Sequence, residues 1–193
     1  MSATSAAQPI APGRVLADLV PGSRVRDAIL VASFAAVLGL SAQVAVPLPF
    51  TPVPVTGQTF AVLLGAAALG ASRATLGASL YLALGLVGVP WFTATGGASF
   101  GYILGFVAAA AIVGRLARAG NDRTVGRTVG LMLIGNLAIY AFGVTGLALF
   151  LGVGLVEATA LGAVPFLVGD ALKLALAAAL LPTTWRLVGH RAD

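Results

Sequence analysis

Two charged residues lie within a predicted apolar helix. Asp170 and Lys173 interrupt the apolar segment that follows Pro165, and Lys173 is the only lysine of the chain. Their spacing of three places both side chains on one face of a helix. A charge inside a membrane helix costs roughly 2.5–3.5 kcal/mol on insertion scales, so such residues are functional candidates by default. Two interpretations stay open: an internal ion pair that holds helices together, or a ligand site open to the outside.

Weaker candidates are uncharged polar side chains within predicted helices or at their ends: Gln58, Tyr102, Asn136 and Tyr140. Asn136 and Tyr140 are four residues apart and share a helix face. A hydrogen bond between helices and a ligand contact both explain residues of this kind. Trp91 and Phe92, in a predicted external loop, form either an anchor at the membrane interface or a lid over an apolar ligand.

The composition excludes several classes of protein. The 193 residues are 59% hydrophobic and only 9% charged, against roughly 45–50% and about 25% in soluble domains. An ordinary soluble domain, a disordered chain and a nucleic-acid binder are therefore excluded. Cysteine is absent and His190 is the single histidine, so we expect neither a metal nor a cofactor. No Walker motif or catalytic constellation occurs, so the chain does not hydrolyse ATP itself and is not expected to be an enzyme.

Helix breakers divide the apolar sequence into helices. Four prolines between residues 47 and 54, and Pro90 followed by Gly96 and Gly97, indicate loops. With about 20 residues needed per membrane span, the chain is predicted to be an all-α polytopic membrane protein with one domain, 24–193. Its six predicted spans are 27–46, 57–72, 74–89, 100–118, 128–150 and 165–185. Residues 151–164 are read as a loop or a short interfacial helix.

The arginines predict the orientation. With six spans, every arginine falls on one side: before the first span, between the second and third, between the fourth and fifth, and after the sixth. The positive-inside rule then places both termini in the cytoplasm. Residues 1–23 lack an apolar stretch and are predicted to form a flexible cytoplasmic tail rather than a secretory signal.

Small residues recur at helical spacing in two places. Ala28, Ala32 and Ala36 form a ridge on the first span, and Gly97, Gly101 and Gly105 lead into the fourth. Ridges of this kind permit close helix contact. They serve either internal packing or the docking of a partner helix.

The motifs together resemble the BioY family, the biotin-binding S components of energy-coupling-factor (ECF) vitamin transporters. The most specific match is the segment 52–60, Pro-Val-Pro-Val-Thr-Gly-Gln-Thr-Phe. Further matches are Tyr81-Leu82 with Gly85, the segments 88–92 and 101–106, and Pro165-Phe166 with Gly169-Asp170 and Lys173. Together these matches occur in a regular order and extend over most of the chain beyond the tail.

The resemblance implies a six-helix fold in the cell membrane that binds biotin near the outer face, under the external loops. Asp170 and Lys173 match ligand positions of the family. A carboxylate can accept the two ureido N–H groups of biotin, and Lys173 can serve either end of the ligand. Trp91, Phe92 and Tyr102 would cover its rings. The loop after the third span offers Thr93, Thr95 and Ser99 where some members have asparagine or arginine.

The resemblance also implies partners: a transmembrane coupling protein and two ATP-binding subunits. The ridge Ala28, Ala32 and Ala36 matches the surface where S components are thought to touch the coupling protein. Dependence on these partners stays open. The alternatives are an S component for another vitamin and a stand-alone carrier that uses Asp170 and Lys173 for proton coupling.

Overall fold

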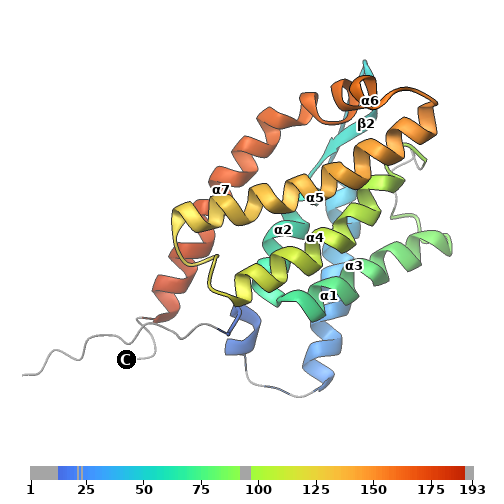
Figure 1. Ribbon diagram of the computed structural model, residues 1–193. Helices are drawn as coiled ribbons and strands as arrows, with labels where there is room; N and C mark the ends of the chain where they lie inside the picture. Colours follow the sequence, from blue (N-terminus) through green and yellow to red (C-terminus); the bar gives the residue numbers. More distant parts are fainter. Residues whose placement is uncertain (1–12, 21, 23, 92–96, 190–193) are drawn as a thin grey trace, which may run out of the picture.

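The computed structural model describes residues 13–20, 22, 24–91 and 97–189 (Figure 1). Its elements are η1 (Leu16–Leu19), α1 (Arg24–Gln43), β1 (Ala45–Leu48), β2 (Thr51–Thr56), α2 (Gln58–Leu69), α3 (Ala71–Leu86), α4 (Phe100–Arg118), α5 (Val125–Leu151), α6 (Leu155–Gly162), η2 (Val164–Phe166) and α7 (Leu167–Gly189). The chain is mostly helical, as predicted.

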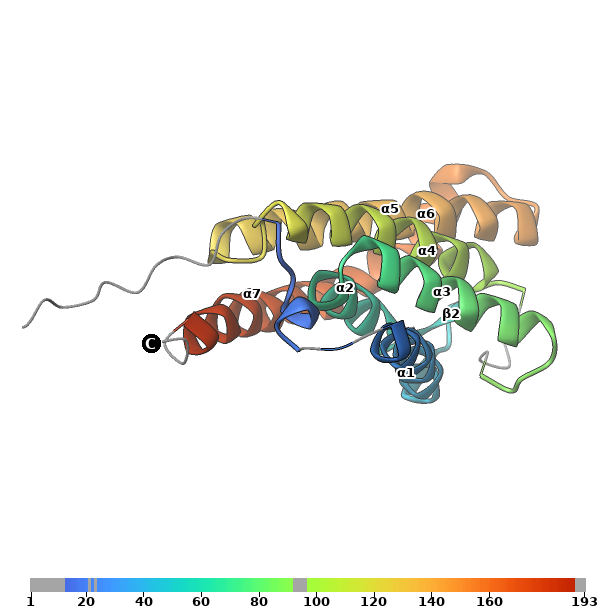
Figure 2. The ribbon, with the colours of Figure 1, turned by 90° about the horizontal axis from the view of Figure 1, so that it is seen from below.

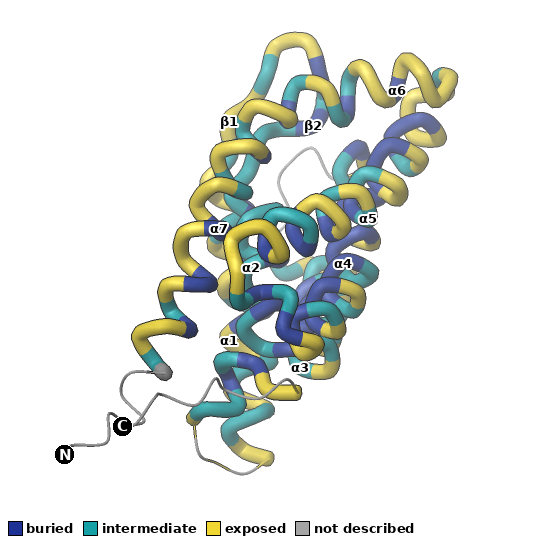
Figure 3. Tube along the Cα trace, turned by 60° about the vertical axis from the view of Figure 1, so that its left-hand side comes forward, coloured by how far each residue is buried: buried dark blue, intermediate teal, exposed yellow. Residues whose placement is uncertain are grey.

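Helix α4 is the centre of the bundle. It packs most extensively on α5 and also contacts α2 and α3, while α1 packs on α3. Helix α7 packs on α5 and α2, and Figure 2 shows α5 and α1 on opposite sides of the bundle. Buried positions concentrate on α4, whereas α1, α6 and α7 carry many exposed apolar residues (Figure 3). An apolar outer surface of this kind suits a lipid environment.

Glycines on α4 allow its close approach to α5. A Cβ atom at Gly101 would lie 2.5 Å from the Phe142 carbonyl oxygen, and one at Gly105 would lie 2.9 Å from Ile139 Cα. Any larger residue would push the two backbones apart. The prediction that this glycine series permits close helix contact is confirmed for Gly101 and Gly105.

Four helical segments among the described residues are long and apolar enough to cross a membrane by length and composition: 24–43, 100–118, 125–151 and 155–188. Helices α2 and α3 have 12 and 16 residues. At 1.5 Å per residue they reach about 18 and 24 Å, which is less than a bilayer core. Helix α2 is shorter than the predicted span 57–72, and α3 begins three residues before the predicted span 74–89, because Gly70, at φ +80°, ends one helix immediately before the next begins. The count of six complete spans stays a prediction.

The proline-rich segment predicted as a loop is an antiparallel hairpin, so the description all-α is corrected here. Strands β1 and β2 pair with Ala45 opposite Thr56 and Leu48 opposite Thr51, and the register is irregular beside Pro47. Both strands of a two-stranded sheet are edges, and proline is tolerated at an edge because its missing N–H faces away from the partner strand. The first helix accordingly ends at Gln43 rather than at residue 46.

Part of the segment predicted as a flexible tail packs against the helices. Val15 is fully buried, and the Gly13 N–H donates to the Arg118 carbonyl oxygen at 2.8 Å. Arg73 Nη1 lies 2.7 Å from Asp18 Oδ1. Burial raises the pKa of Asp18, but the hydrogen bonds from Arg73 and the Val15 N–H, together with the nearby arginine charges, outweigh burial and lower this pKa. Residues 13–20 therefore form part of the folded domain.

Candidate functional site

Asp170 and Lys173 lie side by side on the first turns of α7, as their spacing predicts. Lys173 Nζ lies 3.3 Å from Asp170 Oδ1, and the side chains are 20% and 8% exposed for Lys173 and Asp170 respectively. Tyr140, on α5, donates a hydrogen bond from its hydroxyl to Asp170 Oδ2. A carboxylate offers about four lone-pair positions, so Asp170 retains acceptor capacity for further donors.

Lys173 connects α7 to the hairpin and to α2. Its ammonium donates to the Thr56 carbonyl oxygen at 3.0 Å and to Thr59 Oγ1 at 2.7 Å, in addition to Asp170. An ammonium has three N–H donors, and each has an acceptor within the described part of the chain. The lysine therefore neutralises Asp170 and also fixes the end of β2 against α7.

These groups form one wall of a pocket that is partly open to solvent. The lining residues are Val53, Pro54, Val55, Thr56, Gln58, Thr59, Ser99, Tyr102, Ile103, Phe106, Tyr140, Phe166, Asp170 and Lys173. Apolar walls and one concentrated group of polar side chains suit a ligand with an apolar body and a polar end.

Two further predicted site residues, Gln58 and Tyr102, also line this pocket. The hydroxyl of Tyr102 donates to the Gly162 carbonyl oxygen at 2.6 Å, so this residue offers the pocket its ring. The Gln58 amide nitrogen donates to the Tyr81 hydroxyl at 2.8 Å and to the Leu38 carbonyl oxygen at 3.4 Å. Both amide N–H donors of Gln58 are therefore directed toward α3 and α1.

The other predicted site residues are not brought together with this group. Asn136 lines a smaller pocket between α2, α5 and α7, which shares Lys173 with the larger one. Trp91 does not belong to the described lining; its indole stacks on Tyr81 and packs against Gly39 of α1. Phe92 lies outside the described residues, as do Thr93 and Thr95.

Sequence reasoning missed most of the apolar lining. Ile103, Phe106 and Phe166 read as ordinary core residues, because an apolar side chain beside a cavity has the same pattern as one in a packed interface. The alternation Val53-Pro54-Val55 is a period-two signal that indicates a strand, and the prolines concealed it. Thr56 contributes its backbone carbonyl oxygen, which carries no side-chain signal.

The alanine ridge lies on the outside of the bundle. Ala28 and Ala32 are exposed and Ala36 is half-buried, whereas Phe34 and Leu38 of the same helix are buried in the core. Ala28 and Ala32 are therefore exposed at the edge of the α1 face that packs internally.

The fold and the site define a class: an integral membrane protein with a partly enclosed pocket for a small molecule. Groups of three or more His, Cys, Asp or Glu residues that could hold a metal are absent from the described part of the chain. The pocket instead offers hydrogen-bonding groups and aromatic surface.

Comparison with known proteins gives the family. Residues 12–190 match the BioY family, and the chain belongs to it. It is 31% identical over 170 residues to the biotin transporter BioY of Rhizobium etli, covering 80% of this chain and 90% of the relative. It is 34% identical over 161 residues to the biotin transporter BioY of Thermotoga maritima, covering 80% and 92%.

A solved structure has the same fold. The 2.1 Å crystal structure of the S-component for biotin from an ECF-type ABC transporter superposes with a TM-score of 0.73 at 20% identity, covering 84% of this chain and 92% of the other. The match to the family and the two relatives confirm the predicted resemblance to the BioY family.

Proposed function

We propose that this chain is the substrate-binding membrane subunit of a biotin transporter, and that it captures biotin at the outer face of the plasma membrane. The single observation that carries the proposal is the pocket in which Asp170, Lys173 and Tyr140 meet under the hairpin. Membership of the BioY family and the names of the relatives support biotin as the ligand.

The chemistry of biotin fits this pocket. Its ureido group has two N–H donors and one carbonyl acceptor, its bicyclic body is apolar and its tail is acidic. The free lone pairs of Asp170 can accept the ureido N–H groups, and the ring of Tyr102 can cover the bicycle. Lys173 already donates to three protein acceptors. It therefore contacts biotin by exchanging one of them, or acts by holding Asp170 and Thr56 in place.

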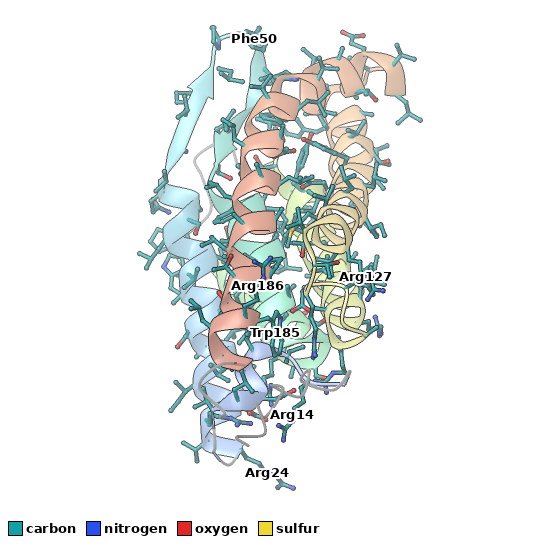
Figure 4. The ribbon with its side chains drawn as sticks, turned by 90° about the vertical axis from the view of Figure 1, so that its left-hand side faces the viewer. Arg14, Arg24, Phe50, Arg127, Trp185 and Arg186 are labelled. Atoms are coloured by element: carbon teal, nitrogen blue, oxygen red, sulfur yellow. The ribbon has the colours of Figure 1, made fainter. Side chains whose placement is uncertain are left out.

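The outer face is assigned to the end of the bundle that carries the hairpin. Phe50, at the hairpin tip, lies at one end of the molecule, and Arg14 and Arg24 lie at the other (Figure 4). The segment between Asp27 and Arg73, which contains the hairpin, has no charged residue. This asymmetry supports cytoplasmic termini and six spans, with the short helices α2 and α3 completed by their flanking segments.

The test of biotin binding is calorimetry on the purified, detergent-solubilised chain without ATP or partners. We expect saturable heat with biotin and none with thiamine or riboflavin. Heat with one of these other vitamins and none with biotin would assign the chain to another substrate. Uptake that follows the proton gradient in the absence of any ATP-binding subunit would favour the carrier alternative.

Delivery of biotin is proposed to require an ECF coupling protein and two ATP-binding subunits. The exposed ridge of Ala28 and Ala32 on α1 supports docking of a partner helix. In Ala32→Leu, the larger side chain should hold that helix off, and uptake should fall by about tenfold or more at unchanged biotin affinity.

The matched control is Ser33→Leu, which introduces the same side chain at a neighbouring exposed position of α1 outside the ridge. We expect this control to keep both the uptake and the biotin affinity of the parent. Equal loss of uptake in both variants, or loss of binding in Ala32→Leu, would contradict docking at this ridge.

A further inference from the structure

A chain of buried contacts leads from the pocket to a tryptophan that lies outside it. Gln58 lines the pocket and is 6% exposed, and its amide nitrogen donates to the Tyr81 hydroxyl at 2.8 Å. Tyr81, on α3, is 1% exposed and donates to the Trp91 carbonyl oxygen at 3.3 Å. The rings of Tyr81 and Trp91 are stacked, with centroids 6.5 Å apart and planes 12° apart.

The chain of contacts ends on helix α1. A Cβ atom at Gly39 would lie 2.6 Å from Trp91 Cδ2, so glycine at this position is what allows the indole to rest against the α1 backbone. The Gln58 amide reaches α1 as well, through the Leu38 carbonyl oxygen. The contacts therefore join the pocket wall to the outer half of the helix that carries Ala36 and the rest of the exposed ridge.

These contacts have little freedom to adjust independently. Tyr81 and Gln58 are buried, and the hydroxyl of Tyr81 is held between the Gln58 amide and the Trp91 carbonyl group. Buried polar groups keep their partners because an unpaired one is costly. A ligand that moves the Gln58 side chain must therefore move the Tyr81 hydroxyl, and with it the support of Trp91.

We propose that Tyr81 is a positioning residue that couples the filling of the pocket to the packing of Trp91 on α1. The ligand class is the one given under Proposed function, on which this inference rests. Tyr81 does not contact the ligand. It transmits a displacement of Gln58 to the stacked indole, so that the packing of α1 differs between the empty and the filled protein.

The two tryptophans of the chain allow a direct test. The full chain is labelled with 5-fluorotryptophan, and its two fluorine resonances are assigned with Trp91→Phe and Trp185→Phe. We expect added biotin to shift the Trp91 resonance, with saturation at the dissociation constant given by calorimetry. Trp185 lies at the other end of α7 and hydrogen-bonds Asp122, so its resonance should not move and serves as the control within the same spectrum.

The variant Tyr81→Phe tests the role of the Tyr81 hydroxyl separately from that of the ring. It keeps the ring that stacks on Trp91 and removes the two hydrogen bonds. We expect its biotin affinity to stay within about threefold of the parent, because no ligand contact is lost, while the shift of the Trp91 resonance is largely abolished. A shift of full size in Tyr81→Phe would overturn the proposal, since it would mean that the ligand acts on Trp91 by another route.

Two results on the parent protein decide the proposal even if Tyr81→Phe does not fold. Heat with biotin but an unmoved Trp91 resonance in the parent overturns this inference and leaves the proposed function intact. Absence of heat with biotin overturns the proposed function itself.

The variant Gly39→Ala provides a second test of the coupling, because its Cβ atom should displace the indole of Trp91. We expect its Trp91 resonance to start from a new position and to lose the response to biotin; a response of parental size would contradict the coupling.

Discussion

A buried carboxylate lies near each end of helix α7: Asp170, which belongs to the helix, and Asp122, which contacts it. The two sites differ in the groups that balance the negative charge and in the space around the carboxylate. Near the start of α7, Asp170 is paired with a lysine and a tyrosine and lines a pocket. Near its end, Trp185 Nε1 donates to Asp122 Oδ2 at 2.6 Å, and Asp122 is fully buried. The second carboxylate has a neutral donor as its direct partner and does not belong to a described pocket lining.

The difference separates a binding site from a structural contact. Asp170 lies beside the opposite charge of Lys173 and keeps free lone pairs at the wall of the pocket. The donor groups of a ligand can therefore form further hydrogen bonds to it. The Asp122 Oδ1 atom has no hydrogen-bond partner in the described part of the chain. Arg123, whose guanidinium carbon lies 4.3 Å from the centre of the Trp185 ring, covers this contact. Asp122 therefore fastens the loop between α4 and α5 to α7.

The largest expected effect is that of Asp170→Asn on biotin binding. A charge-assisted hydrogen bond contributes about 1.5–3 kcal/mol, so the affinity should fall roughly 10- to 100-fold. Calorimetry measures this change, and Asp122→Asn is the matched control with affinity within about threefold of the parent. Comparable losses in the two variants would remove the distinction between the sites.

The double variant Asp170→Asn with Lys173→Met tests whether the pair binds ligand or only holds helices together. Removing both charges leaves neither one unpaired, so thermal stability should recover relative to Lys173→Met alone. If the pair touches biotin, the stable double variant should still bind biotin about tenfold or more weakly than the parent. Parental affinity in a stable double variant would exclude both residues from the binding site.

Trp185→Phe should lower stability and leave binding nearly unchanged. It keeps an aromatic ring beneath Arg123 but removes the donor to a buried carboxylate, a loss of about 1–3 kcal/mol. The melting temperature should fall, whereas biotin affinity measured on the folded protein should stay within about threefold. A large loss of affinity at an unchanged melting temperature would show that the end of α7 controls the pocket.

The smallest expected effect is a dependence of stability on pH at Asp122. Burial raises the pKa of Asp122 above its usual value, although the Trp185 hydrogen bond, its own backbone N–H and the charge of Arg123 oppose the shift. The folded state therefore holds this proton more tightly than the unfolded chain does, and stability increases as pH falls through the raised pKa toward the ordinary value of 3.8.

The asparagine side chain of Asp122→Asn does not titrate, so this variant provides the reference for the measurement. As pH falls from 7 toward 4, the melting temperature of the parent should gain on that of the variant by on the order of 2 °C. Asp18, with its lowered pKa, acts in the opposite direction in both proteins and cancels in the difference. A constant difference across this range would contradict the assignment.

The amino-acid sequence was enough to predict the membrane class, the positions of most helices and the proximity of Asp170 and Lys173. These features depend on local spacing: apolar runs set the helices, and a separation of three places two side chains on one face. It also determined the family, through motifs spread along the chain. The glycines of α4 belong to the same group, since small residues at helical spacing predict close packing whichever helix the neighbour is.

Which side chains share the pocket depends on how the helices and the hairpin pack together. The hairpin brings Thr56 to a lysine 117 residues later in the chain, and no local pattern specifies such an encounter. The same holds for Trp91, which proved to be a packing partner of Gly39 and Tyr81, and for Asp122, whose partner Trp185 lies 63 residues further along. A cavity is a property of how whole helices fit together, so its apolar walls cannot be told from core residues until the fold is known.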